Sequence, residues 1–220
     1  MADIFRNLDW TIVLRIIPAL ICITLHELAH GYTAYRLGDP TAKNMGWLTL
    51  NPIKHIELFG ILMMVVARFG WAKPVPVNRR YFKNPKGHMA ITALAGPVSN
   101  IILAVVVYFI FGLIYELFGG LYATGASRVV LDIVYSCAEL SVILAIFNLL
   151  PIPPLDGSKI LFSLLPEQSY DKLMRYERFG MIILILFVWS PIFGETFGRI
   201  TFAASDWFFG ISRFAHGLVN

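Results

Sequence analysis

Residues 89–115 read MAITALAGPVSNIILAVVVYFIFGLIY and contain no charged side chain. A helix needs about 20 mostly apolar residues to cross the ~30 Å hydrocarbon core of a bilayer. This stretch exceeds that length without interruption. We therefore predict a transmembrane helix here, which makes the chain an integral membrane protein.

The composition of the whole chain agrees with this class. Of its 220 residues, 57% are hydrophobic and 15% are charged, whereas soluble domains are on average about half apolar and a quarter charged. The sequence pI of about 9.1 is also compatible with a nucleic-acid-binding protein. However, the cations lie between the apolar runs, as they do in the loops of membrane proteins. We predict a single integral membrane domain over residues 1–220, in contact with the lipid bilayer, and no nucleic acid partner.

Three more apolar runs are candidates for membrane helices. Trp10–Tyr35 is interrupted by ionisable residues, Val129–Leu150 contains two acidic residues, and Phe179–Gly194 is uncharged but barely long enough to span. Residues 196–214 mix charges with aromatic residues, which favours an interfacial amphipathic helix over a fifth span. The predicted fold is an α-helical polytopic membrane protein, with a three-helix core and one or two further membrane helices.

The connection between the first two spans contains signals for strands. Trp47-Leu48-Thr49-Leu50 precedes Asn51-Pro52, and Val75-Pro76-Val77-Asn78 follows Ala72-Lys73-Pro74. The two prolines of the second segment lie two residues apart, so their missing N–H groups fall on the same edge of a strand. Such a strand can be fully paired on one side only. We predict a small β-sheet at the membrane surface.

The cations are distributed unequally among the connections between spans. The first connection contains Arg36, Lys43, Lys54, Arg68, Lys73, Arg79, Arg80, Lys83 and Lys86; the second contains Arg128; the third contains Lys159, Lys172, Arg175 and Arg178. Because Lys and Arg gather in cytoplasmic loops, we predict that the first and third connections are cytoplasmic and that the N-terminus is outside. The expected location is the cell membrane, with several spans.

The first span contains the sequence His26-Glu27-Leu28-Ala29-His30. Residues four apart lie on the same face of a helix, so both imidazoles can bind one metal ion. Glu27 lies beside that face, where its carboxylate can accept a proton from a water at the metal. Ionisable residues inside a transmembrane helix are costly and are functional by default. The alternative interpretation is a satisfied polar patch that packs against another helix.

A zinc ion bound by two histidines and a water lacks one protein ligand. Counting back from Arg36 at about 1.5 Å per residue puts His30 and His26 roughly 9 and 15 Å from the cytoplasmic end of the span. The third span passes from outside to inside and ends in NLLPIPPLDG, residues 148–157, whose prolines stop the helix. It therefore brings Asp156 to the same side of the membrane as the histidines.

Three other interpretations compete at this site. Asp156 suits a simple N-cap for a helix over residues 157–165. Cys22 lies one turn before the first histidine and can in principle bind the metal, although a small apolar residue in a helix contact is favoured. Gly96 lets two helices approach closely at the predicted depth of the metal, which makes Asn100 either a polar neighbour of the site or a helix-packing residue.

The combination of H-E-x-x-H in a first span with N-x-x-P-x-P-x-L-D-G at the end of a later span resembles the site-2 protease family of intramembrane zinc metalloproteases. The likeness covers about residues 12–165, and Gly96-Pro97-Val98-Ser99-Asn100 is similar to that family's G-x-x-x-N segment. The resemblance implies a compact member without a PDZ or CBS domain, and one bound Zn²⁺.

The resemblance also implies a role for each motif residue. The implied zinc ligands are His26, His30 and Asp156. The implied catalytic carboxylate is Glu27, and Asn148 is implied to hold the substrate backbone. Asn100 is a second candidate for substrate binding. The expected activity is hydrolysis of peptide bonds in or near transmembrane segments of membrane-protein substrates, at an active site toward the cytoplasmic side.

A different function uses the same donors: a zinc-binding transporter or sensor without protease activity. A transporter needs a polar path on both sides of the metal, but the outer half of the second span, Ile101–Tyr115, contains no charged group. Glu27 has no task in binding zinc, so its presence favours an enzyme.

Overall fold

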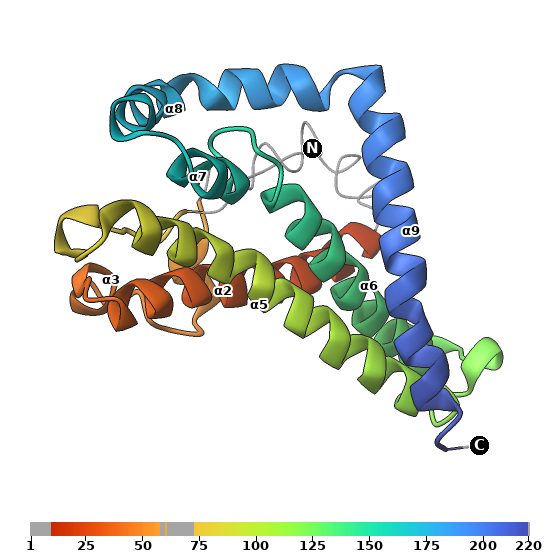
Figure 1. The fold of residues 1–220 in the computed structure, drawn as a ribbon. Helices are drawn as coiled ribbons and strands as arrows, with labels where there is room; N and C mark the ends of the chain where they lie inside the picture. The colour runs from red at the N-terminus through yellow and green to blue at the C-terminus, as the bar shows by residue number, and fades with distance from the viewer. Residues whose placement is uncertain (1–9, 58–59, 61–72, 220) are drawn as a thin grey trace, which may run out of the picture.

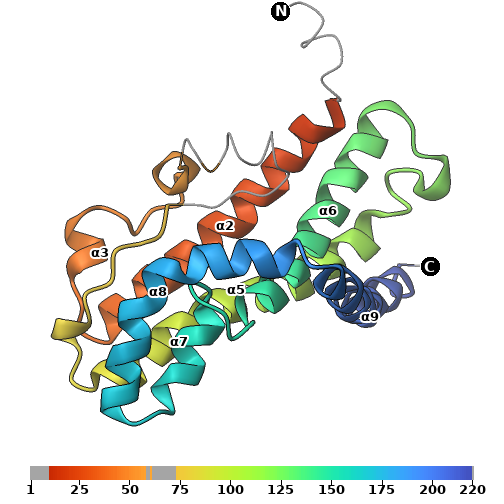
Figure 2. The ribbon, with the colours of Figure 1, turned by 90° about the horizontal axis from the view of Figure 1, so that it is seen from above.

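The computed structural model describes residues 10–57, 60 and 73–219 (Figure 1). Three long helices form its centre: α2 (Trp10–Arg36), α5 (Pro85–Ile114) and α6 (Gly125–Asn148). Each packs against the other two, and they lie side by side in both views (Figure 1, Figure 2). This arrangement is the predicted three-helix core.

Further elements connect these helices and follow them. They are α3 (Thr41–Asn44), the 3-10 turns η1 (Pro52–His55), η2 (Arg79–Tyr81) and η3 (Gly120–Tyr122), and the helices α7 (Asp156–Ser163), α8 (Glu167–Val188) and α9 (Pro191–His216). Of the last three helices, α7 packs on α5, and α9 packs on α5 and α6.

Two of the described helices, α5 and α6, are long and apolar enough to cross a membrane, so the spans predicted over residues 89–115 and 129–150 are confirmed in length and apolarity. The bent pair 179–188 and 193–216 adds a third if it counts as one span. The helix α2, which carries H-E-x-x-H, is 27 residues long and stays a predicted span.

The run predicted as a fourth span, residues 179–194, is not a single straight helix. Residues 179–188 and 193–216 form two helices whose axes differ by 81°. Ser190 accepts a hydrogen bond from Phe193 N, and Pro191 occupies the first position of α9, where its missing N–H breaks no helical bond. This start signal ends α8 and begins a new helix in a new direction.

The helix predicted over residues 196–214 is present inside α9, and it packs on the bundle. The ring of Phe209 packs edge-to-face against Tyr108 of α5. Gly112 permits the close contact, because a Cβ atom there would lie 2.2 Å from the carbonyl oxygen of Ser212. The C-terminal part of α5 is thereby covered by α9.

The predicted surface β-sheet is wrong for the described residues, which contain no strand. Two N–H groups of the second predicted strand bond to side-chain carboxylates: Val75 N donates to Glu27 Oε2 and Asn78 N donates to Asp39 Oδ2. A donor engaged by a carboxylate cannot pair with a neighbouring strand. Residues 58–59 and 61–72, between the two predicted strands, lie outside the described part of the chain.

Candidate metal centre

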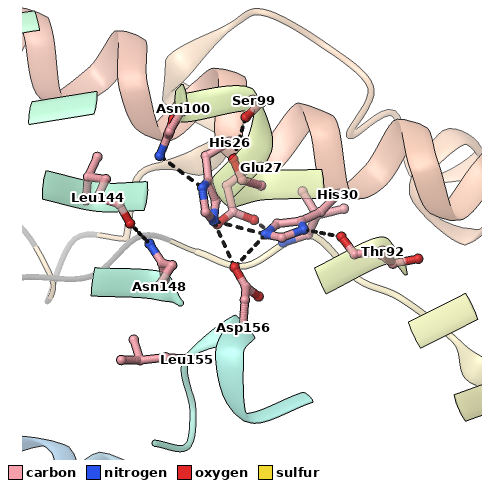
Figure 3. Close-up of polar contacts among 12 residues, drawn as sticks. His26, Glu27, His30, Thr92, Ser99, Asn100, Leu144, Asn148, Leu155 and Asp156 are labelled. Atoms are coloured by element: carbon pink, nitrogen blue, oxygen red, sulfur yellow. Dashed lines mark hydrogen bonds and ion pairs between the residues drawn. The ribbon is translucent and has the colours of Figure 1, made fainter. Parts of the chain in front are cut away.

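Two histidines of α2 and an aspartate from a distant part of the sequence meet between α2 and the start of α7 (Figure 3). Nε2 of His26 and Nε2 of His30 are 3.0 Å apart, and each lies 3.1 Å from Oδ2 of Asp156. All three residues are more than nine-tenths buried. One donor atom from each lies within 4.8 Å of the others, which is the proximity that a shared metal ion requires.

The chain after α6 turns sharply and carries Asp156 into this group. Three prolines in residues 149–155 prevent α6 from continuing. A Cβ atom on Gly157 would lie 2.2 Å from the carbonyl oxygen of Leu149, so glycine is required where the chain doubles back. The N-cap residue of α7 is Leu155, and the Asp156 side chain contacts the imidazoles instead of capping the helix.

One face of α5 holds the two histidine rings. Thr92 and Asn100 are eight residues apart and therefore share that face. The Nδ1 group of His30 donates to the Thr92 carbonyl oxygen at 2.7 Å, and Nδ2 of Asn100 lies 3.1 Å from Nδ1 of His26. Because both Nδ1 atoms are engaged by α5, both Nε2 atoms are available on the side of Asp156.

Gly96 lies between these two contacts, and the imidazoles occupy the space that a side chain would fill. A Cβ atom there would lie 2.4 Å from Nε2 of His30 and 2.6 Å from Cε1 of His26. The close helix approach predicted at Gly96 is therefore confirmed, and it is an approach of α5 to the two rings.

Glu27 lies beside the three donors and is not one of them (Figure 3). The residue is half-buried, and its Oε2 accepts the Val75 N–H at 2.9 Å. Within the described residues, its Oε1 has no hydrogen-bond partner. A carboxylate with one fixed and one free oxygen therefore adjoins the donor group.

The two predicted substrate-binding residues lie in different environments. Asn100 is completely buried, and its Oδ1 has no hydrogen-bond partner. Asn148 is half-buried at the end of α6, where its Nδ2 donates to the Leu144 carbonyl oxygen at 3.0 Å (Figure 3). Of the two, Asn148 is the one whose side chain is accessible to a bound peptide.

Cys22 is not part of the donor group. It is completely buried, and its Sγ lies 3.2 Å from Ser141 Oγ and 3.8 Å from Cys137 Sγ, both on α6. The favoured interpretation of Cys22 as a small residue in a helix contact is confirmed.

A bundle of membrane-type helices that buries H-E-x-x-H against a carboxylate from a distant turn defines a membrane metallopeptidase. Residues 15–190 match Peptidase family M50, and the chain belongs to that family. The family resemblance predicted from the motifs is thereby confirmed.

The similar proteins found by comparison are also named as zinc metalloproteases. The protein provisionally named zinc metalloprotease YwhC, from Bacillus subtilis, is 46% identical over 178 residues, which cover 80% of each chain. Two proteins provisionally named zinc metalloprotease Rip2 are more distant. The one from Mycolicibacterium smegmatis is 29% identical over all of this chain and 82% of its own, and the one from Mycobacterium tuberculosis H37Rv is 26% identical over 90% and 74%. No solved structure matches the chain.

Proposed function

We propose that this chain is an intramembrane zinc metalloprotease that hydrolyses peptide bonds in or near transmembrane segments of membrane proteins. The observation that carries the proposal is the meeting of His26, His30 and Asp156 with Glu27 beside them. A zinc-binding protein needs the three donors alone, whereas a hydrolase also needs a carboxylate that stays off the metal. The M50 family and the zinc metalloprotease names of the relatives agree with it.

The donor set fits zinc. Two neutral imidazole nitrogens and one carboxylate oxygen, with a fourth position left for water or substrate, are typical ligands of a catalytic zinc. A zinc ion held by His26, His30 and Asp156 would supply Lewis acidity to a water and to the scissile carbonyl. Glu27 accepts the proton of the attacking water through its free oxygen and gives it to the leaving amine. Asn148 donates its amide to the substrate backbone.

Asn100 is better placed to orient His26 than to touch a substrate. A histidine that binds a metal through Nε2 carries its proton on Nδ1 and donates it to a neighbouring group. A half-turn of the Asn100 amide brings its unpartnered Oδ1 beside Nδ1 of His26. Asn100 is therefore assigned as a positioning residue for a zinc ligand.

Asn100→Leu is expected to weaken zinc binding by about 10- to 100-fold, because it keeps the size of the side chain and removes the acceptor for His26. Asn100→Asp keeps an acceptor and should bind zinc at least as tightly as the wild type. Competition with a chelator measures both. Ser99→Ala is the control, since Ser99 donates to the Gly96 carbonyl on the same helix and, among the described residues, forms no hydrogen bond with a histidine. Wild-type affinity in Asn100→Leu contradicts the assignment.

The direct test of function measures zinc content and peptide cleavage on the same purified protein. We expect one zinc per chain and cleavage of single-span peptides reconstituted with it in lipid. Zinc binding without cleavage of any peptide favours a transporter or sensor, an alternative that no feature of the described residues supports.

The active site is further proposed to face the cytoplasm, on the strength of the cation distribution. Single cysteines at Lys43 and Lys172 should react with an impermeant thiol reagent from the cytoplasmic side only, and one at Thr124 from outside only. All three positions are exposed, and the native Cys22 and Cys137 are buried, which keeps the background low. Labelling from the opposite sides contradicts the orientation.

A further inference from the structure

Residues 73–78, called the strap here, run past Glu27 without forming a helix. Pro74 and Pro76 have no N–H group, so Val75 supplies the single backbone donor between them. That donor bonds to Oε2 of Glu27 at 2.9 Å. The Val75 side chain is buried in a small apolar cluster with Ala42, Trp47 and Leu48, which holds this part of the strap against α3 and the residues that follow it.

Two further contacts fix the strap at its ends. Asp39, just after α2, is completely buried, and its Oδ2 accepts the Asn78 N–H at 2.6 Å. The other oxygen of Asp39 accepts the N–H of Thr41 at 2.9 Å and the Thr41 hydroxyl. At the other end, Lys73 N donates to the His55 carbonyl oxygen at 3.0 Å. The strap is therefore held on both sides of Val75.

These contacts bypass the metal donors. Among the described residues, the strap donates hydrogen bonds to Glu27, Asp39 and His55, and none to His26, His30 or Asp156. The two histidines are held by α5 and the carboxylate of Asp156 by the turn before α7. The base and the metal donors thus have separate supports.

We propose that the strap positions Glu27 for proton transfer, with the Val75 N–H as the direct contact and Asp39 as a remote positioning residue. The inference rests on the proposed function, because that function makes Glu27 the base. A glutamate has several rotatable bonds, and misplacing a reacting group by about 1 Å can cost about 10²-fold in rate. An N–H that holds Oε2 fixes the position of Oε1, which takes the proton.

The first test compares Val75→Pro with Val75→Ala. Proline removes the N–H, whereas alanine keeps it and controls for the loss of the valine side chain. We expect Val75→Pro to lower kcat by about 10-fold or more relative to Val75→Ala, with KM and zinc content unchanged, because only the contact to the base is lost. Equal kcat values for the two variants, or loss of zinc in Val75→Pro alone, overturn the proposal.

The second test asks whether Asp39 acts through Val75. In Asp39→Asn one of the two oxygens becomes an NH₂ group. The remaining oxygen is favoured at the Oδ1 position, where it accepts both donors of Thr41, so the NH₂ group faces Asn78 N, which loses its acceptor. We expect a several-fold lower kcat at wild-type zinc content, and no further loss when Asp39→Asn is added to Val75→Pro. Additive losses show that Asp39 acts independently and overturn its assignment.

Thr41→Ala is the matched control for Asp39→Asn, since it removes one bond to Asp39 and leaves the Asn78 contact in place. It should keep the wild-type kcat. If Val75→Pro does not fold, the comparison of Asp39→Asn with Thr41→Ala decides alone: a selective loss of kcat in Asp39→Asn supports the strap, and equal kcat values or a loss of zinc overturn it. A wild-type protein that binds zinc and cuts no peptide contradicts the proposed function instead.

Discussion

Glu27→Gln is expected to abolish peptide cleavage while the purified protein keeps its zinc. Glutamine has nearly the same shape and can still accept the Val75 N–H, but it cannot take a proton from water. The loss should reach at least the roughly 10²- to 10⁴-fold that a positioned general base contributes. Zinc content is unaffected because Glu27 is not among the donors that meet at the site. Cleavage of a single-span peptide and elemental analysis of the same sample measure the two effects.

Glu139→Gln is the matched control for this substitution. Glu139 is also a half-buried carboxylate in a membrane-type helix, but it lines a cavity of about 760 Å³ between α5, α6 and α9. Its α6 neighbours Cys137 and Ser141 contact Cys22 of α2, so Glu139 lies on the opposite face of α6. The Glu139→Gln variant should cut peptides at the wild-type rate. Near-normal turnover in Glu27→Gln would remove Glu27 from the mechanism.

Asp156→Ala is expected to lose both zinc and activity. Removing one of three donors leaves two imidazoles, and the affinity should fall by more than the roughly 10- to 100-fold typical of a lost outer partner. Asp156→Asn keeps the size of the side chain but removes the negative charge, and it should give an intermediate loss. Zinc titration against a chelator separates these variants without any assay of cleavage.

Cys22→Ala is the control for Asp156→Ala, because Cys22 is the other candidate ligand that the sequence offers. Its sulfur contacts Ser141 and Cys137 on α6, so the variant should keep its zinc and its activity. If Cys22→Ala loses the metal and Asp156→Ala keeps it, the third ligand is assigned wrongly.

Much of the fold and the donor group could be predicted from apolar runs, residue spacing and the distribution of charges in the sequence. The helices α5 and α6 follow from long apolar runs, and the two histidines share a face because they are four residues apart. Asp156 could be placed with them because the cation distribution predicts the direction of each span. The structure places these three side chains together.

The errors arose where contacts between distant residues decide the structure. The predicted sheet is missing in the described residues because Glu27 and Asp39, which are far away in sequence, take the N–H groups of Val75 and Asn78. The hydrogen-bond partner of His30 could not be predicted either. It is the backbone carbonyl of Thr92, and every residue has such a group, so the sequence does not indicate which one is used. The break between α8 and α9 is different, since Ser190 and Pro191 are a recognisable start signal.

The contact of Gly96 with the two imidazoles has a consequence for natural variation at this position. A glycine inside an apolar helix looks like a packing residue, and a change to alanine there normally counts as conservative. Here the added methyl group would occupy the volume of the His30 and His26 rings, 2.4 and 2.6 Å away. Interpreting such a variant as a mild helix change would therefore miss its effect, which is displacement of two of the three proposed metal ligands.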